Sequence, residues 1–377
     1  MPSSRIGETH LYMLEKKDKL NSVLYLHGRP SAHALHSSLA RSITNQFKFI
    51  DEPIRWQDKK YPGVLNLFIW IVNAICFKNK KKYDLFLLDN LHITPVFMRA
   101  LRLITKNQKL VAHMGSHTLY FMYAGKFSRI NIALHKWALQ RYDAIICEGK
   151  MAEDFCKHLL KEKCPPTYVT FLGPLTKRIE RLIKCTPDFK SHNILIIAHG
   201  PGEFRKFYKG LDIMIAAFYI AWKENPKLEL NILGTWDQAI IQECLNGLSD
   251  EAISAIHFQS NRGDLEHFFN NSALCLHCSR GDAFPTSTIE AMTAGLPTLL
   301  SDLTGTKDIT TQIDLNLIAP LDIHSIANQI IWYFSLSEAE KQLLSGKGRE
   351  IAKNFTEEKA IVHYQQVFNK IIEQCGL

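Results

Sequence analysis

Long apolar runs are missing from the sequence. No stretch of its 377 residues approaches the roughly 18 to 20 apolar residues that a membrane-spanning helix needs. The N-terminus, Met-Pro-Ser-Ser-Arg, lacks the charged and then apolar start of a secretory signal. The nine cysteines are odd in number and have no framework spacing, so they indicate no disulfide scaffold. We therefore expect a folded protein in a reducing, cytoplasmic compartment.

Motifs for metal ions and nucleic acids are also missing. No Asp-x-Asp sequence, which would supply carboxylates for a divalent metal, occurs in the chain. Cys275-Leu-His-Cys278 has no second cysteine pair at zinc spacing and lies in an apolar segment, so we expect it to pack in the core. There is no zinc finger and no aromatic and basic RNA-binding stretch. The sequence thus predicts no metal site, no cofactor and no nucleic-acid partner.

The chain does have an ordinary globular composition with an excess of positive charge. Hydrophobic residues make up 46% and charged residues 22%, which are values of a folded protein. Its length fits two domains of ordinary size, whose cores need no disulfides. The net charge of +8 favours anionic ligands, and both nucleotide sugars and an anionic membrane surface are compatible with it.

Short apolar segments alternate with helical patterns along the chain. Strands are expected at 22–27, 47–50, 85–89, 109–113, 144–147 and 168–172, with helices up to residue 41 and at 63–77, 94–105, 126–141 and 150–161. A second series begins at 193–198. Repeated alternation predicts an α/β fold with parallel sheets covered by helices on both faces. We predict two Rossmann-like domains, 1–175 and 190–355, joined by a polar linker.

The most informative stretch spans residues 279–297, between two short apolar segments that predict strands. Ser287 and Glu290 have the Ser-x-x-Glu spacing of a capping box, which predicts the start of a helix. Gly295 suits the left-handed residue that follows a helix, and Pro297 prevents its continuation. The stretch therefore predicts a strand, a loop and a helix of about two turns.

The start of this helix is suited to an anion. Ligands of parallel α/β sheets bind outside the carboxyl ends of the strands, and free N–H groups at a helix N-terminus favour negative charge. The candidate donors are the N–H groups of Thr286, Ser287 and Thr288. On local chemistry alone two interpretations stay open: Asp282 and Glu290 bind a ligand, or they are only a turn residue and a cap.

The segment from Asp282 to Pro297, Asp-Ala-Phe-Pro-Thr-Ser-Thr-Ile-Glu-Ala-Met-Thr-Ala-Gly-Leu-Pro, resembles the acidic-x7-acidic signature of family-4 retaining glycosyltransferases. The first acid is Asp here, where the family usually has Glu, one methylene longer. The resemblance implies the GT-B fold, in which two Rossmann-like domains face an interdomain cleft and a C-terminal helix, here 356–377, crosses back. It also implies that Asp282 binds sugar hydroxyls and that Glu290 hydrogen-bonds the donor ribose.

A second part of the resemblance lies in the loop at 199–212, which is rich in glycine and in positive charge. Lys209-Gly-Leu-Asp is similar to a Lys-Gly-x-Asp element whose cations hold the donor pyrophosphate in the family. The resemblance assigns Lys209 directly. Arg205 is our choice for the accompanying arginine, because a guanidinium fork suits phosphate oxygens, with Lys206 and backbone N–H groups as alternatives. A merely solvated basic loop is the competing interpretation.

Four further positions are candidates because they lie near strand ends. The resemblance makes His113 the histidine that helps position the sugar in catalysis, and His117 is its rival, assigned to the acceptor. Either histidine could instead be structural. Gly28, in a strand–glycine–helix start, and Phe258, expected beside the nucleotide base, are assigned to the donor by the same resemblance.

The predicted function is transfer of a sugar, with retention and without a metal ion, from a nucleotide-diphosphate sugar to a glycan or lipid-linked acceptor. The apolar segment 63–77 and the lysine-rich 78–82 would suit an anionic surface on the inner face of the membrane, but a helix buried against the sheet is the alternative. Two other functions stay open. One is a non-catalytic nucleotide-binding GT-B subunit, and the other is a sugar-nucleotide epimerase on the same fold.

Overall fold

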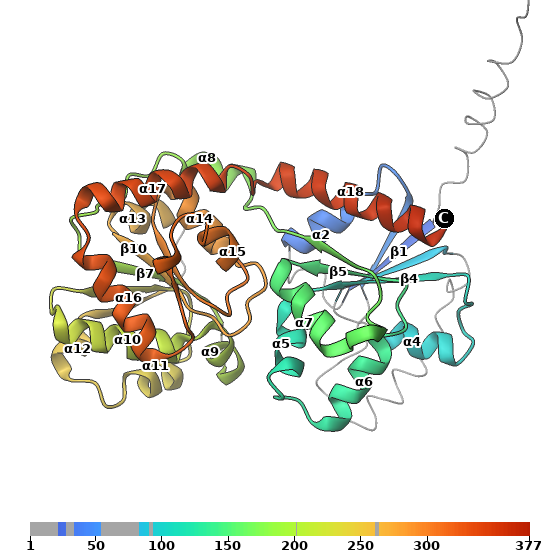
Figure 1. Cartoon of the computed structure of the whole chain (residues 1–377), viewed down its shortest axis with the longest axis horizontal. Helices are drawn as coiled ribbons and strands as arrows, with labels where there is room; N and C mark the ends of the chain where they lie inside the picture. Colours follow the sequence, from blue (N-terminus) through green and yellow to red (C-terminus); the bar gives the residue numbers. More distant parts are fainter. Residues whose placement is uncertain (1–21, 28–33, 54–82, 90–92, 201, 261–263) are drawn as a thin grey trace, which may run out of the picture.

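A computed structural model of the chain describes residues 22–27, 34–53, 83–89, 93–200, 202–260 and 264–377. These residues form two lobes, each built on a six-stranded parallel sheet flanked by helices (Figure 1). The prediction of an α/β fold with two Rossmann-like domains is confirmed. Three features of the sequence analysis lie outside the described residues: Gly28, the predicted helix at 63–77 and the lysine-rich segment 78–82.

The sheet of the first lobe has the strand order β2-β1-β3-β4-β5-β6. Its strands are β1 (Ser22–His27), β2 (Lys48–Pro53), β3 (Leu85–Asp89), β4 (Lys109–Met114), β5 (Ala144–Glu148) and β6 (Thr167–Thr170). Every residue of β3 and β5 is buried. This burial explains why these strands read as continuous apolar runs, because parallel sheets are covered on both faces.

The helices of the first lobe differ in part from those expected. They are α2 (Ala34–Arg41), α4 (Ile93–Ala100), α5 (Ser116–Tyr123), α6 (Arg129–Leu139) and α7 (Lys150–Leu160), followed by the short η1 (Lys161–Lys163). The helix expected over 94–105 ends early because the chain turns at Arg102, whose φ is 58°. Helix α5 was not predicted. Most of its residues are apolar, so its sequence has no polar face to reveal a helical period.

The sheet of the second lobe has the strand order β12-β11-β10-β7-β8-β9. Its strands are β7 (Asn193–Ile197), β8 (Glu229–Leu233), β9 (Ile256–Gln259), β10 (Leu274–His277), β11 (Thr298–Ser301) and β12 (Ile318–Ala319). The chain passes from β7 to β8 on one side and later returns to place β10 on the other side. The order therefore reverses between β7 and β10, and the crevice at such a reversal is where open α/β sheets bind ligands.

The second lobe also contains helices, which flank its sheet. They are α9 (Glu203–Lys209), α10 (Leu211–Glu224), α11 (Gln238–Leu245), α12 (Asp250–Ser254), α13 (Leu265–Asn270), α14 (Thr286–Ala294), α15 (Lys307–Thr310), η2 (Leu315–Leu317), α16 (Ile323–Ser335) and α17 (Glu338–Ala352). Half of the basic segment expected as a loop at 199–212 is helix α9, and its last two residues begin α10. Gly210, at φ 71°, separates α9 from α10 and lets the chain change direction.

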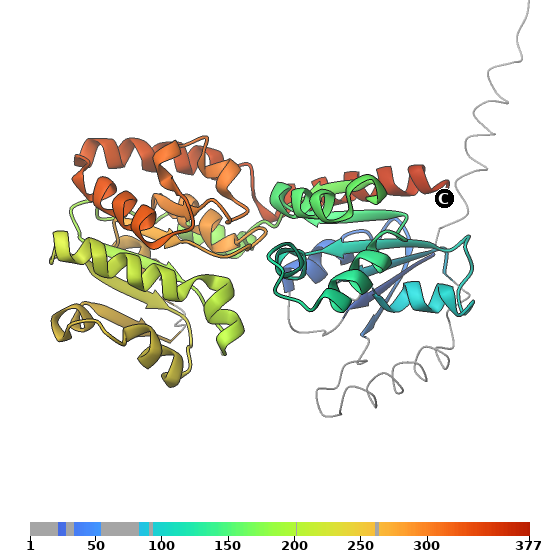
Figure 2. The ribbon, with the colours of Figure 1, turned by 60° about the horizontal axis from the view of Figure 1, so that its bottom comes forward.

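Two crossings connect the lobes. The chain leaves β6 through residues 171–175 into α8 (Thr176–Leu182), and it returns in α18 (Glu357–Cys375), which lies along the first lobe (Figures 1 and 2). The crossings touch at Gly173, where an added Cβ would lie 2.2 Å from the carbonyl carbon of Thr356. On the first lobe, His363 of α18 hydrogen-bonds the carbonyl of Val169 at 2.9 Å. The last helix therefore belongs physically to the first lobe.

Candidate functional site

The signature helix α14 begins two residues earlier than the capping box predicted. Pro285 is its N-cap residue, and no side chain caps the helix. Ser287 then lies inside the first turn, where its Oγ approaches His277 Nδ1 at 3.5 Å instead of capping. Glu290 lies beyond the first turn. The predicted capping box is therefore wrong, and Glu290 is free of that structural role.

A buried polar cluster surrounds Asp282, which follows β10. Asp282 as a residue is 9% exposed, and its Oδ2 receives Lys209 Nζ at 2.5 Å. His277 Nε2 lies 3.4 Å from the same oxygen, and Tyr208 donates its hydroxyl to Oδ1 at 3.4 Å. Asp282 and Lys209 are 73 positions apart in the sequence. The loop after β10 and the end of α9 thus bring together an acid and a cation that the sequence assigned to sugar and pyrophosphate.

The charges of this cluster determine its protonation. Burial alone would raise the pKa of Asp282, but Lys209 and His277 outweigh burial and hold the pKa well below its usual range. Burial also lowers the pKa of His277, although Asp282 opposes that shift. At neutral pH the carboxyl group of Asp282 is therefore ionised and the imidazole of His277 is neutral. Such a carboxylate can accept hydrogen bonds from hydroxyl groups.

Glu290 has a different partner. It is 5% exposed, and both of its carboxylate oxygens face Arg178 Nη1, at 3.0 Å and 3.2 Å. Arg178 lies on α8, in the crossing between the lobes, and its side chain is half exposed. Burial raises the pKa of Glu290, and Arg178 opposes the rise. The sequence analysis missed Arg178, because no local pattern connects two residues 112 positions apart.

The remaining basic residues near α9 have separate partners. Lys206 Nζ contacts Glu203 at 2.6 Å and Glu243 at 2.5 Å, so its charge is taken up by those two acids. Arg205 lies against the loop that follows β7, because a Cβ added at Gly200 would be 2.4 Å from Arg205 Cγ.

Arg280, two residues before Asp282, was not predicted. Its guanidinium holds Asp212 through two hydrogen bonds, of 2.7 Å and 2.8 Å, and donates to the carbonyl of Phe207 at 2.7 Å. These bonds fix the start of α10 and the end of α9 to the signature loop. The sequence pointed to Arg280 only through its position within the signature stretch.

The two candidate histidines lie in different surroundings. His113 in β4 is fully buried, with Nε2 3.2 Å from Glu148 Oε1 and its ring 5.6 Å from that of Tyr364 on α18. His117 in α5 faces the other lobe. Its ring lies 6.1 Å from that of Phe204 and 6.3 Å from that of Tyr208, centroid to centroid, both on α9. Only His117 therefore touches groups of the second lobe.

Glu148 is a further acid that the sequence analysis did not single out. It ends β5, is 4% exposed, and faces His113. A Cβ added at Gly115 would be 3.3 Å from its Oε2 atom. Its position at a strand's carboxyl end, followed by Gly149, was a usable signal, because ligand-binding acids occur at such ends.

Direct packing joins the signature loop to the first lobe. A Cβ added at Gly281 would lie 2.3 Å from Tyr120 Cγ, and one added at Gly149 would lie 2.8 Å from the carbonyl oxygen of Ala283. The ring of Phe204 stacks on that of Phe121, with centroids 5.1 Å apart. The cluster around Asp282 therefore adjoins the surface where the two lobes meet.

Two other predicted donor residues are engaged in packing. Phe258 in β9 is half buried and packs against the core of its lobe. Thr288 is buried, and its hydroxyl donates to the carbonyl of Pro285 at 2.7 Å and lies 2.9 Å from the Thr306 hydroxyl. Thr286 and Ser287, in contrast, are partly exposed at the start of α14.

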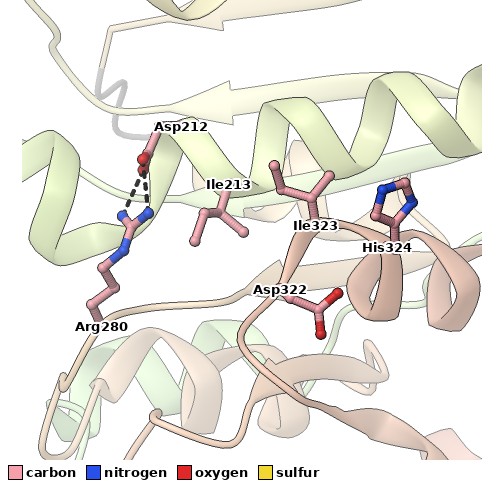
Figure 3. A pocket seen from close by; sticks show the side chains of 6 residues that line it. All are labelled: Asp212, Ile213, Arg280, Asp322, Ile323 and His324. Atoms are coloured by element: carbon pink, nitrogen blue, oxygen red, sulfur yellow. Dashed lines mark hydrogen bonds and ion pairs between the residues drawn. The ribbon is translucent and has the colours of Figure 1, made fainter.

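A pocket of about 590 Å³ opens beside this cluster. It is lined by Asp212, Ile213, Arg280, Asp322, Ile323 and His324, from the starts of α10 and α16 and from the signature loop (Figure 3). Lys209, Asp282 and Glu290 do not line it. Among the described residues no group of His, Cys, Asp and Glu could hold a metal ion, and no helix could cross a membrane.

Residues 201–347 match the family model "Glycosyl transferases group 1". No curated protein matches the sequence. Solved structures resemble the whole chain at low identity. The sucrose-phosphate synthase of Thermosynechococcus elongatus is 15% identical, with a TM-score of 0.69 over 94% of this chain and 99% of the other.

Two further structures were solved with nucleotides. Anabaena HepE, in complex with UDP and glucose, is 16% identical, with a TM-score of 0.67 over 94% of this chain and all of the other. The E. coli trehalose-6-phosphate protein bound with UDP-2-fluoro glucose is 12% identical, with a TM-score of 0.65 over 95% and 99%. These likenesses show the GT-B fold. The family match, which spans most of the second lobe, makes the chain a glycosyltransferase of the EC 2.4 class.

Proposed function

We propose that this GT-B glycosyltransferase is a family-4 type, retaining enzyme. It would transfer a sugar from a nucleoside-diphosphate sugar to a glycan or lipid-linked acceptor, without a metal ion. The observation that carries the proposal is the contact of Lys209 with Asp282 in the loop before α14, next to the reversal of the sheet order, with Glu290 buried in that helix.

The donor would bind across the start of α14. The ammonium of Lys209, the guanidinium of Arg205 and the first N–H groups of α14 provide positive charge for a diphosphate. Glu290, buried behind them, would accept hydrogen bonds from the ribose hydroxyls. The nucleotides in HepE and in the E. coli protein support a donor of this class.

Asp282 would bind hydroxyl groups of the transferred sugar. Its pKa is held low, so it remains an ionised acceptor and cannot protonate a leaving group near neutral pH. In the unliganded chain it holds Lys209 Nζ at 2.5 Å. A donor diphosphate would compete for this ammonium, and the sugar hydroxyls would then supply hydrogen-bond donors to Asp282.

Retention would follow from attack on the face that the diphosphate leaves. The bond between the anomeric carbon and the phosphate oxygen breaks, and the departing oxygen accepts the proton of the acceptor hydroxyl. That hydroxyl oxygen forms the new bond on the same face, so no side chain needs to act as a covalent nucleophile. Lys209 and the N-terminus of α14 would stabilise the charge that develops on the leaving group, a task that needs no metal here.

The histidines would serve the sugar and the acceptor. His113 is buried against Glu148, so we place it as a group that supports the reaction centre through that acid. His117, which faces α9, would contact the acceptor. Association with an anionic membrane on its cytoplasmic side is part of the proposal and is supported by the net charge of +8.

Nucleotide release from a panel of sugar nucleotides, with and without glycan and lipid-linked acceptors, tests this function. We expect turnover of one donor in the wild type and its loss in Glu290→Ala and Lys209→Ala. Lys190→Ala, at a largely exposed lysine of the same lobe, is the matched control and should stay active. Full activity in both site variants would refute the assignment. Donor binding without release would favour the non-catalytic subunit, and conversion of the donor alone would favour the epimerase.

A further inference from the structure

The contact between Arg178 and Glu290 joins the candidate donor site to the connection between the lobes. Arg178 lies on α8, outside both sheets, yet its Nη1 atom reaches both carboxylate oxygens of Glu290 in α14. The carboxylate is almost fully buried, whereas the arginine side chain is half exposed. The cation therefore covers the buried acid from the solvent side.

A buried carboxylate needs such a partner to stay ionised. Burial disfavours the charged form, and a protonated Glu290 would lose half of its capacity to accept hydrogen bonds from two ribose hydroxyls. A guanidinium carries its charge at any accessible pH, and its Nη1 atom contacts both oxygens, so it restrains the orientation of the carboxylate as well as its charge. Arg178 has the position required for both effects.

The same segment is attached to the returning helix. Thr176, two residues before Arg178, donates its N–H and its hydroxyl to Glu357 Oε2, both at 2.9 Å. Glu357 is the first residue of α18, which lies along the first lobe. The contact of Thr176 with Glu357 therefore helps to set the orientation of Arg178, together with the second lobe.

We propose that Arg178 is a positioning residue for donor binding: from the interlobe connection it holds Glu290 ionised and oriented toward the donor ribose. This inference rests on the proposed function of Glu290. Arg178 itself would contact neither the sugar nor the reacting atoms, so it is not a catalytic residue.

The other elements packed against α14 offer Glu290 little competing charge. On β10 the nearest titratable group is the thiol of Cys275, whose pKa burial raises to about 12, so it is neutral. On α17, Arg349 donates to the carbonyls of Thr293 and Ala294 at the far end of α14. Strand β11 carries no titratable residue. Arg178 is thus the cation that directly faces this carboxylate among the described residues.

A double-mutant cycle on nucleotide binding tests the proposal. Titration calorimetry would measure the dissociation constants of UDP and of GDP for the wild type, Arg178→Ala, Glu290→Gln and the double variant. We expect Arg178→Ala to weaken binding roughly 10- to 100-fold, the weight of one hydrogen bond to a charged group. In the Glu290→Gln background the same change should have little further effect.

Arg181, one turn further along α8, offers a matched control because it forms an ion pair with Glu266 away from the site. Arg181→Ala should bind nucleotide like the wild type. Arg178→Lys should recover part of the affinity, since it keeps the charge but not the planar fork. If Arg178→Ala folds poorly, Arg178→Lys and Arg178→Gln carry the same comparison.

The pH profile separates positioning from a structural role. Nucleotide affinity should fall as the pH is lowered through the pKa of Glu290, and this fall should begin at a higher pH in Arg178→Ala. An Arg178→Ala protein that melts earlier but binds UDP or GDP with the wild-type affinity and pH profile would overturn the inference. A wild type that binds no nucleoside diphosphate would instead refute the proposed function, and the inference with it.

Discussion

The ammonium of Lys209 lies 2.5 Å from Asp282 Oδ2, although Lys209 ends helix α9, Asp282 lies in the signature loop and the two are 73 positions apart. The side chain of Lys209 is 18% exposed and that of Asp282 is 12% exposed, so water screens the pair only partly. Each charge therefore depends on the other in the unliganded protein. Several consequences of this ion pair can be measured.

Lys209→Ala should destabilise the protein in the absence of donor. The change leaves Asp282 buried without its closest cation, and loss of one partner of such a pair typically costs about 1–3 kcal/mol. Urea denaturation of Lys209→Ala against the exposed control Lys190→Ala measures this cost. Equal unfolding free energies would mean that the ion pair contributes nothing to stability.

The stability contributed by Asp282 should disappear in acid. Its pKa is lower in the folded than in the unfolded state, so this contribution is complete above the unfolded value of about 4 and is lost as the pH falls toward the folded value. The difference in melting temperature between wild type and Asp282→Asn should therefore shrink below about pH 4. A difference that is constant from pH 3 to pH 7 would contradict the assigned charge state.

The interface between the lobes should not accept a side chain at Gly149. There φ is 82°, and an added Cβ would lie 2.8 Å from the carbonyl oxygen of Ala283. Gly149→Ala combines this clash with backbone strain of about 1–2 kcal/mol. Gly125→Ala is the matched control, since φ is 66° but nothing lies within 4 Å of the new Cβ.

Thermal melting and transfer rates of the two glycine variants would separate strain from clash. Both should lose stability, but Gly149→Ala should lose more, and only Gly149→Ala should lose activity. Equal losses in both would mean that packing of Gly149 against the signature loop is unimportant.

His117→Ala should affect the acceptor and spare the donor. Its ring faces Phe204 and Tyr208 of α9, so its removal opens the surface between the lobes but leaves the ion pair of Lys209 and Asp282 in place. We expect a several-fold higher KM for the acceptor and an unchanged KM for the donor. The control is His158→Ala, at a histidine of α7 that contacts Tyr123 on the same lobe. An effect confined to the donor KM would argue against the acceptor assignment.

Much of the fold could be predicted from sequence, because buried parallel strands appear as short apolar runs. The same logic predicted that Lys209 and Asp282 would both lie at strand ends, and the structure brings them together. Helix α5 escaped prediction because most of its residues are apolar, and α9 because its charges and the glycines that flank it resemble a loop. The capping box failed because Pro285 is the N-cap, two residues before the predicted one.

Side-chain partners that depend on the tertiary structure could not be predicted. Arg178 and Glu148 come from the connection and from the first lobe, and neither has a spacing that indicates Glu290 or His113 as its partner. The sequence also could not show which of Lys206 and Arg205 would be paired with neighbouring acids. Glu203 and Glu243 hold Lys206, and only the folded chain reveals this.

The most direct test of the account is a thermal-shift screen of UDP, GDP, ADP, dTDP and CMP with their sugars, on wild type, Glu290→Ala and Lys190→Ala. A ligand that binds only the folded state raises the melting temperature by mass action. We predict a rise with one nucleoside diphosphate or its sugar, kept in Lys190→Ala and lost in Glu290→Ala. A rise of equal size in Glu290→Ala, or no rise with any of these nucleotides, would contradict the assignment of this site.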